Sequence, residues 1–455
     1  MYHAETWKQK ITLYLSILWP IMVTQISLVA MNFVDTIMSG RVGTDDLAGV
    51  AIGASLWMPV FTLVIGILLS VIPIVAQLSG SGHKEKIAPS VTQALYLAVI
   101  LSLFVILIGR LFLEDILVFM DLEPAVQHIA FHYLVGLSIG IIPLFVSNAL
   151  RNFFDGQGFT RITMLITVSA VPFNVLFNYA LIFGHFGMPA LGGIGAGYAT
   201  GITYWLILGF SVLLTIGLPK VRHYRILYHW PKPSLKFWKE QLSIGLPIGL
   251  SIFFEATIFS VVTLLVGIMY TTTTIGANQV TLSFISLLFT IPLSISMALT
   301  IVVGYSVGGK QFKSAKQYSL IGFLGALCFA GFNAILLITF REQIASLYTD
   351  DPQVIMLAGQ FFIVATFFQF SDSAQASLQG VLRGYKDVTI PFFIAFVSYW
   401  IIGIPAGYLL AAYSPLGAFG LWVGISIGLS CAAIGFLVRL RMTQSRLEKT
   451  IHETI

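Results

Sequence analysis

The stretch TLYLSILWPIMVTQISLVAMNFVDTIM at residues 12–38 contains 27 residues, and Asp35 is its only charged side chain. A bilayer core roughly 30 Å thick is crossed by about 20 apolar helical residues, so this stretch is long enough to span a membrane. Similar runs recur along the 455-residue chain and are continuously apolar, unlike the alternating segments of about ten residues in membrane barrels. We therefore predict an all-α integral membrane protein.

Twelve apolar runs of this kind occur in the sequence. The chain is 57% hydrophobic and only 9% charged, whereas soluble domains carry about 25% charged residues. The first run is long and contains an acid, unlike a cleavable signal segment, so we expect it to be retained. The predicted transmembrane helices lie at residues 12–38, 50–78, 91–112, 128–150, 161–184, 193–218, 240–268, 278–307, 317–340, 353–381, 388–411 and 416–438.

Two halves of the sequence resemble each other at an offset of about 227 residues. LSILWPI at 15–21 parallels LSIGLPI at 242–248, and IVAQLSGSGHK at 74–84 parallels IVVGYSVGGKQ at 301–311. Each half holds six predicted spans, an even number, so both halves begin on the same side of the membrane and the repeat is parallel. We predict two pseudo-symmetric six-helix bundles.

The predicted domain boundaries follow from this repeat. An N-terminal lobe at 1–218 and a C-terminal lobe at 240–455 are joined by a linker at 219–239 that is rich in Lys and Pro. A cleft between two such bundles is the natural place for a substrate site that opens to each side of the membrane in turn.

The distribution of basic residues predicts the orientation of the chain. If the N-terminus is cytoplasmic, all but three of the 24 Lys and Arg fall in cytoplasmic segments, and the exceptions are Arg41, Arg110 and Arg341. This asymmetry is the positive-inside pattern. We therefore predict a multi-pass protein of the plasma or inner membrane with both termini in the cytoplasm. The formal charge of +5 then gives no reason to expect nucleic acid as a partner.

No segment offers a convincing nucleotide site. GYSVGGK at 304–310 is close to a phosphate-binding loop, but Gln311 occupies the place of the Ser or Thr that would hold magnesium, and no strand precedes the loop. We expect no cofactor, and the energy for transport then has to come from an ion gradient, with Na⁺ or H⁺ as the coupling ion, or from the membrane potential.

Three carboxylates lie within the predicted spans, out of 19 Asp and Glu in the chain: Asp35, Glu255 and Asp372. A carboxylate at mid-membrane costs about 2.5–3.5 kcal/mol on insertion scales, so such residues usually serve function. No Lys or Arg shares their spans, so the acids must be protonated or neutralised by bound cations. We predict that all three bind the coupling ion and are candidate Na⁺ ligands. For Asp35, in the outer part of its span, a structural hydrogen-bonding role stays open.

Polar side chains in the fifth and sixth spans offer further oxygen ligands. Asn174 and Asn178 are one helical turn apart on one face, and Thr200 lies in the next span. We predict a role for all three in cation binding, with hydrogen bonding between helices as the alternative.

Aromatic residues cluster in sequence around the C-terminal acids. A cation over an aromatic face gains about 0.5–2 kcal/mol, and the same surface accepts an apolar cargo. Most of the 36 Phe in the chain pack against lipid or other helices, so packing is the alternative for each. The predicted substrate-binding residues are Gln279, Phe254, Phe259 and Phe368.

Several longer motifs resemble those of the multidrug and toxic compound extrusion transporters, most closely the bacterial norfloxacin-exporter branch. They include WPIMVTQ at 19–25, NFVDTIMSG at 32–40, PFNVLFNYALIFG at 172–184, GLPIGLSIFFEA at 245–256 and FQFSDSAQ at 368–375. The resemblance covers nearly the whole chain.

The resemblance implies two six-helix lobes that alternate between outward-open and inward-open states. In its pattern, Glu255 and Asp372 look like a cation site of the C-terminal lobe. Asp35, with Asn174, Asn178 and Thr200, looks like a site of the N-terminal lobe. Within this resemblance, the presence of Asn178 and of both C-terminal acids favours the exporter branch and, with it, Na⁺ coupling.

The predicted function is secondary active multidrug efflux. We expect a monomer without enzymatic activity that exports amphipathic organic cations, such as drugs or dyes, in antiport with Na⁺ or H⁺ across the lipid bilayer. One alternative is a flippase for lipid-linked precursors, whose pyrophosphate cargo would favour intramembrane Lys or Arg. Another is a membrane enzyme, although the short connecting segments offer few catalytic side chains.

Overall fold

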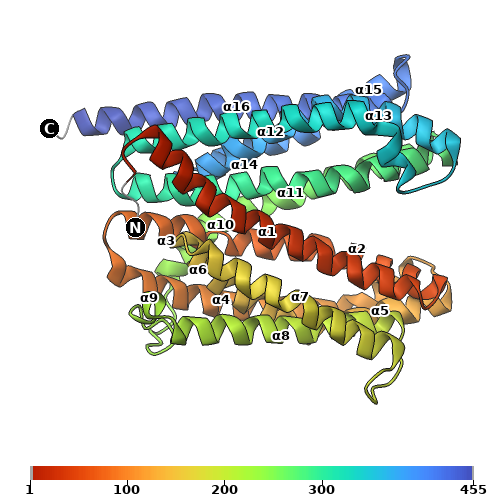
Figure 1. Ribbon diagram of the computed structural model, residues 1–455, viewed down its shortest axis with the longest axis horizontal. Coiled ribbons are helices and arrows are strands. Elements are labelled where there is room, and N and C mark those ends of the chain that lie inside the picture. The colour runs from red at the N-terminus through yellow and green to blue at the C-terminus, as the bar shows by residue number, and fades with distance from the viewer. Residues whose placement is uncertain (1–3, 453–455) are drawn as a thin grey trace. The chain divides into compact units, whose positions relative to one another are not determined.

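The computed structural model describes residues 4–452, and all regular structure in that range is helical (Figure 1). The elements are α1 (Trp7–Gly40), α2 (Thr44–Leu68), α3 (Val71–Gly80), η1 (Lys84–Lys86), α4 (Ile87–Phe119), α5 (Pro124–Ser138), α6 (Ile141–Gly156), α7 (Thr160–Phe183), α8 (Gly193–Gly217), α9 (Pro219–Arg222), α10 (Leu235–Met269), α11 (Thr272–Gly308), α12 (Phe312–Ser346), α13 (Pro352–Gly384), α14 (Thr389–Phe396), η2 (Val397–Gly403), α15 (Ile404–Tyr413) and α16 (Phe419–His452).

Eleven helices in the described range are long and apolar enough to cross a membrane. The pair α5 and α6 passes the same test together and is bent by 50°, which gives twelve spans when the pair counts as one. This agrees with the predicted all-helical membrane fold. The span predicted at 128–150 is this bent pair.

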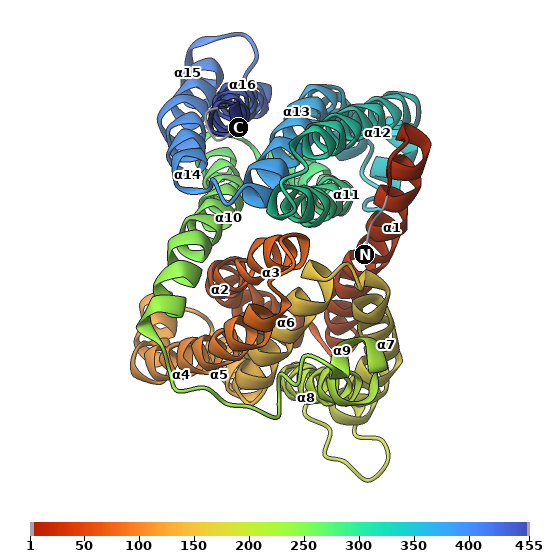
Figure 2. The same ribbon diagram turned by 90° about the vertical axis from the view of Figure 1, so that its left-hand side faces the viewer.

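Packing divides the chain into two compact units, which Figure 2 shows with their helices end on. The first unit, named the N-unit, comprises Trp19–Gly249. The second, named the C-unit, comprises Leu250–Ile455 together with Met1–Leu18. Packing therefore groups the start of α1 with the C-unit and the first turns of α10 with the N-unit. The lobes at 1–218 and 240–455 and the linker at 219–239 stay a prediction about the parts that move in transport.

Close helix contacts recur in both units at a constant spacing. A Cβ atom built on Gly156 would lie 2.9 Å from the Cβ of Val75, and one built on Gly384 would lie 3.0 Å from the Cβ of Val303. Both glycines and both valines are separated by 228 residues. The packing of α6 on α3 is thus repeated by α13 on α11, as expected for a duplicated bundle.

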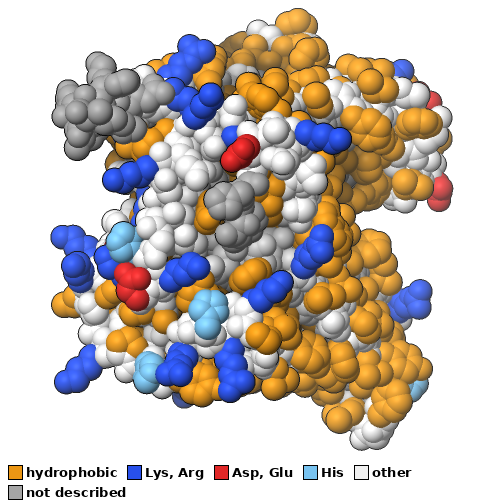
Figure 3. Space-filling model, turned by 60° about the vertical axis from the view of Figure 1, so that its left-hand side comes forward, with side chains coloured by type: hydrophobic (Ala, Val, Ile, Leu, Met, Phe, Trp, Pro, Cys, Tyr) orange, Lys and Arg blue, Asp and Glu red, His pale blue; other side chains and the backbone are white. Residues whose placement is uncertain are grey.

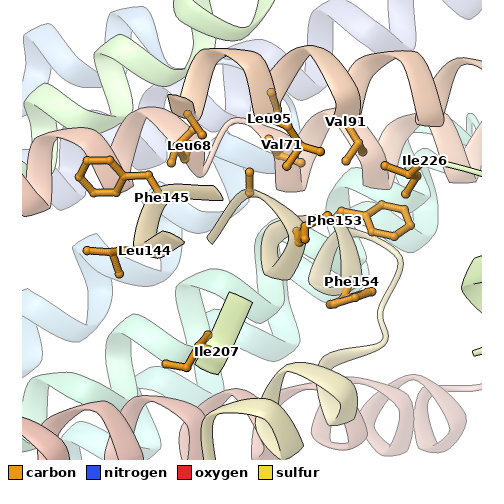
Figure 4. Packing of buried hydrophobic residues seen from close by; sticks show 14 of the residues in the cluster. Leu68, Val71, Val91, Leu95, Leu144, Phe145, Phe153, Phe154, Ile207 and Ile226 are labelled. Atoms are coloured by element: carbon orange, nitrogen blue, oxygen red, sulfur yellow. The ribbon is translucent and has the colours of Figure 1, made fainter. Parts of the chain in front are cut away.

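The hydrophobic core of the N-unit includes the contacts among α3, α4 and α6 (Figure 4). Val71 on α3, Val91 and Leu95 on α4, and Phe145 and Phe153 on α6 are all buried there. In a bilayer such a core is stabilised by close van der Waals packing between helices, because lipid tails are as apolar as these side chains. This core supports α6, whose outer neighbours α7 and α8 carry the polar residues described below.

The turn after α3 and its repeat counterpart after α11 have different residues at a position with a left-handed backbone. Lys310, after α11, has a left-handed backbone with φ 56°, whereas the equivalent residue after α3 is Gly82, with φ 80°. Lys310→Gly is expected to raise the thermal unfolding midpoint by about 1–2 °C. The substitution relieves backbone strain of roughly 1–2 kcal/mol in the folded protein. It also makes the unfolded chain more flexible, which lowers the free energy of unfolding by roughly 0.5–1 kcal/mol, so a small net stabilisation remains.

Tryptophan fluorescence during heating in detergent measures this midpoint. The matched control is Gly82→Ala, which places a side chain in the same backbone conformation and is expected to lower the midpoint. A lower midpoint for Lys310→Gly would contradict the prediction.

Candidate functional site

The predicted acid of the N-unit, Asp35 on α1, is 5% exposed and lies among polar side chains of α7 and α8. Its Oδ1 accepts a hydrogen bond from Asn178 Nδ2 at 2.5 Å, and its Oδ2 accepts one from Thr200 Oγ1 at 2.7 Å. Asn178 Nδ2 also donates to Asn174 Oδ1 at 3.3 Å. The structure thus brings the four predicted residues into one cluster, while their role as cation ligands stays a prediction.

One oxygen of this cluster has no hydrogen-bond partner among the described residues. It is Asn178 Oδ1, a fully buried acceptor. Leaving a buried acceptor unsatisfied costs about 1–3 kcal/mol. Close approach of α7 and α8 confines the cluster, because a Cβ on Gly195 would lie 2.5 Å from the carbonyl oxygen of Leu181. The site therefore combines a carboxylate with an unused amide oxygen, both suitable ligands for a hard cation.

The predicted acids of the C-unit meet at a third residue, Gln375. Glu255 lies on α10, and Asp372 lies on α13 with only 1% of its surface exposed. Gln375 Nε2 donates to Glu255 Oε1 at 2.9 Å and to Asp372 Oδ1 at 3.4 Å. Tyr399 Oη donates to Gln375 Oε1 at 2.9 Å. Asp372 Oδ2 is buried without a partner in the described part of the chain.

A buried arginine interacts electrostatically with one of these acids, Glu255. Arg383, in the last turn of α13, is 5% exposed, and its Nη2 donates to Gln379 Oε1 at 2.8 Å. Its charge also interacts with that of Glu255. We expected no Lys or Arg beside the buried acids, and Arg383 contradicts this expectation. The reason is that α13 continues to Gly384 and buries its last turn.

A half-buried basic residue also occurs in the N-unit, four residues before Asp155, which is the repeat counterpart of Arg383. Arg151 on α6 interacts electrostatically with Asp155, one turn further along. Asp155 is 4% exposed and accepts a hydrogen bond from Thr163 Oγ1 at 2.7 Å. Arg383 and Arg151 therefore each have an acidic neighbour.

The predicted substrate-binding aromatics pack in two places. Phe259 and Phe368 contact edge to face, with ring centroids 5.8 Å apart. Phe368 is only 1% exposed, so its ring packs against other side chains and does not line an open surface. Phe254 packs edge to face on Trp400, with centroids 5.7 Å apart.

Gln279 differs from its neighbour on α11. The side chain of Gln279 is exposed, whereas Asn278 is buried and its Oδ1 accepts from Trp422 Nε1 at 2.9 Å. Trp422 in turn packs edge to face on Phe368, at 5.6 Å between centroids. Asn278 is thus connected to the predicted aromatics by packing, and Gln279 is a predicted substrate contact at the surface.

Gln375, Tyr399 and Arg383 are the site residues that sequence reasoning missed. Gln375 could have been found, because it lies three residues after Asp372 and therefore on the same helix face. Tyr399 comes from another helix, and no local pattern connects it with the acids.

Comparison with known proteins shows matches over nearly the whole chain. The MatE family model matches residues 20–180 and 247–409. A protein of Oceanobacillus iheyensis described as "Probable multidrug resistance protein NorM" is 49% identical over 98% of this chain and 100% of its own length. A Bacillus subtilis protein with the same description is 49% identical over 99% and 100% of the two chains.

Solved structures share the fold at low sequence identity. A structure described as MATE in the bent conformation has a TM-score of 0.89 at 20% identity, over 98% of this chain and 97% of its own. The eukaryotic MATE transporter AtDTX14 has a TM-score of 0.85 at 20% identity, over 99% and 100% of the two chains.

Proposed function

The chain belongs to the MatE family of multidrug efflux transporters, and we propose that it exports amphipathic organic cations in antiport with Na⁺ or H⁺. In this proposal the buried carboxylates are occupied in turn by the coupling ion and by the cargo. Outward-open and inward-open states alternate between the two events. The protein is a multi-pass membrane protein, and we further propose that it acts as a monomer without enzymatic activity.

The observation that carries the proposal is the convergence of Glu255 and Asp372 on one amide nitrogen. The buried Asp372 and the half-buried Glu255, two acids of the same charge, are held together, which favours binding of a cation between them. The free oxygen of Asp372 supplies an unused ligand. Asp35 provides a separate acidic site in the N-unit.

The cargo is proposed from the same charges. Acidic sites repel anions, whereas Phe254 and Phe259, on the same helix as Glu255, offer apolar surfaces and cation–π contacts to an organic cation. Arg383 and Arg151 are basic side chains of the kind that the pyrophosphate cargo of a flippase would favour. Each of them nevertheless interacts with an acid, Glu255 or Asp155, so neither is a free partner for pyrophosphate.

The proposed orientation, with both termini in the cytoplasm, is supported by the basic residues at equivalent turns of the repeat. Lys84 and Lys86 follow α3, and Lys310 and Lys313 follow α11. Figure 3 shows a face on which most charged side chains are Lys or Arg. A cytoplasmic location of these turns satisfies the positive-inside pattern.

Efflux from whole cells tests the proposal. Cells that make the protein are expected to release preloaded ethidium faster than cells carrying the empty vector, as measured by the decay of ethidium fluorescence. An ionophore mixture that removes both the Na⁺ and the H⁺ gradient should abolish the difference, since antiport uses their energy. Faster release that persists after both gradients have collapsed would rule out the proposed coupling.

A further inference from the structure

The two acids of the C-unit are held by a single side-chain amide. The NH₂ side of Gln375 faces Glu255 and Asp372, the orientation that suits ionised carboxylates because these are only acceptors. The amide uses both protons in this way, at 2.9 Å and 3.4 Å. Gln375 itself is 1% exposed, so water has little access with which to replace these bonds. The two carboxylate oxygens thus point toward one small volume before any cation arrives.

Tyr399 holds the other end of the amide. Its hydroxyl donates to Gln375 Oε1 at 2.9 Å, which leaves Nε2 directed at the acids. Tyr399 is 1% exposed and lies among the largest fully buried side chains of the described chain. An amide rotated by half a turn would direct its oxygen at two carboxylates, which is repulsive in a buried site.

An irregular helical segment carries Tyr399 into this position. Residues 397–403 form π-helical turns between α14 and α15, and the N–H of Ile404 bonds to the carbonyl of Tyr399. A π turn holds an extra residue, is rare, and frequently occurs at functional sites. The segment is fixed by tight packing, because a Cβ on Gly428 would lie 2.8 Å from the carbonyl oxygen of Ser398.

We propose that Gln375 and Tyr399 are positioning residues for the coupling cation, which they serve by holding Glu255 Oε1 and Asp372 Oδ1 together around one point. This inference rests on the proposed function, in which these two acids bind the coupling ion. Binding is strengthened when ligands are already arranged as the bound state requires, since less ordering has to accompany it. Without the amide, repulsion between the buried Asp372 and the half-buried Glu255 is no longer offset by a shared donor when both are ionised.

The test is the half-saturating concentration of the coupling cation for ethidium transport by purified protein in liposomes. The cation is Na⁺ at fixed pH, or H⁺ without Na⁺, whichever drives the wild-type protein. Gln375→Met, which keeps the length of the side chain but has no amide, is expected to raise this concentration about tenfold. Tyr399→Phe, which removes only the hydroxyl, is expected to raise it about threefold. The maximal rate should change little in either variant.

A double variant shows whether Tyr399 acts through Gln375 or whether the two substitutions disturb the protein independently. If Tyr399 acts only through Gln375, the Gln375→Met/Tyr399→Phe double variant has the same half-saturating concentration as Gln375→Met alone. Tyr14→Phe is the matched control, because the hydroxyl of Tyr14 is buried without a hydrogen-bond partner in the described structure. Its half-saturating concentration should equal that of the wild-type protein. Should Gln375→Met fail to insert, Tyr399→Phe alone decides the test.

Two results would overturn the inference. One is an unchanged or lowered half-saturating concentration in Gln375→Met, or in Tyr399→Phe if that variant alone can be tested. The other is an effect of Tyr399→Phe that adds fully to that of Gln375→Met. Glu255→Gln and Asp372→Asn, measured in parallel, show whether the proposed function has failed instead. If these variants lose the cation response while Gln375→Met keeps it unchanged, only the inference about positioning is wrong.

Discussion

Cation-driven ethidium efflux is expected to fall about tenfold or more in Glu255→Gln and in Asp372→Asn, because each change removes a charged ligand worth at least about 1.4 kcal/mol. Both replacements keep the shape of the side chain. The amide oxygen that replaces a carboxylate oxygen at either position can still accept the hydrogen bond that Gln375 donates there at present. The variants should therefore insert and remain folded while the response to the cation disappears.

Initial rates in liposomes under an imposed cation gradient measure this effect. The matched control is Glu342→Gln, which neutralises an exposed acid on α12 of the same unit and should leave the rate unchanged. Unaltered rates in both Glu255→Gln and Asp372→Asn would show that the C-unit acids do not couple efflux to the ion.

Asp35→Asn is expected to lower cation-driven efflux by a similar factor of about ten. An asparagine can direct its oxygen toward Asn178 and its NH₂ toward Thr200, whose hydroxyl accepts as well as donates. The hydrogen bonds of the N-unit cluster can thus be kept while the negative charge is lost. A loss of efflux with a normal thermal midpoint would separate ion binding from the structural role that the sequence left open.

The exposed Asp45 supplies the control for this experiment, as Asp45→Asn removes a charge from the same unit outside the cluster. Its efflux rate should match that of the wild-type protein. Wild-type efflux in Asp35→Asn as well would assign Asp35 to packing alone.

The helices and the repeat were predictable because they depend on composition and spacing along the chain. The bend between α5 and α6 was not. Gly140 lies at this break, and a Cβ there would be 2.6 Å from the Cα of Gly201 on α8. Such a close approach joins residues far apart in sequence, and one sequence does not show which glycine faces which.

The acids of the candidate sites were predictable because an acidic residue stands out in an apolar run. Asn174, Asn178 and Thr200 were also found from the sequence, and the structure places them beside Asp35. Tyr399 was missed because the π turns shift its helical face, and ordinary helical periodicity does not predict this shift. The burial of Arg383 depends on the packing of a helix end, which charge and hydropathy alone do not show.

The most direct test of the central claim uses membrane vesicles with the cytoplasmic face outward, loaded with ethidium by transport. They receive either a Na⁺ pulse at fixed pH or a pH step without Na⁺, and dye release is followed by fluorescence. Antiport predicts that at least one of these ions, acting alone, releases the dye. It also predicts that the Glu255→Gln/Asp372→Asn double variant does not respond to that ion. Release by neither ion, or equal release from the wild-type and variant proteins, would contradict the account.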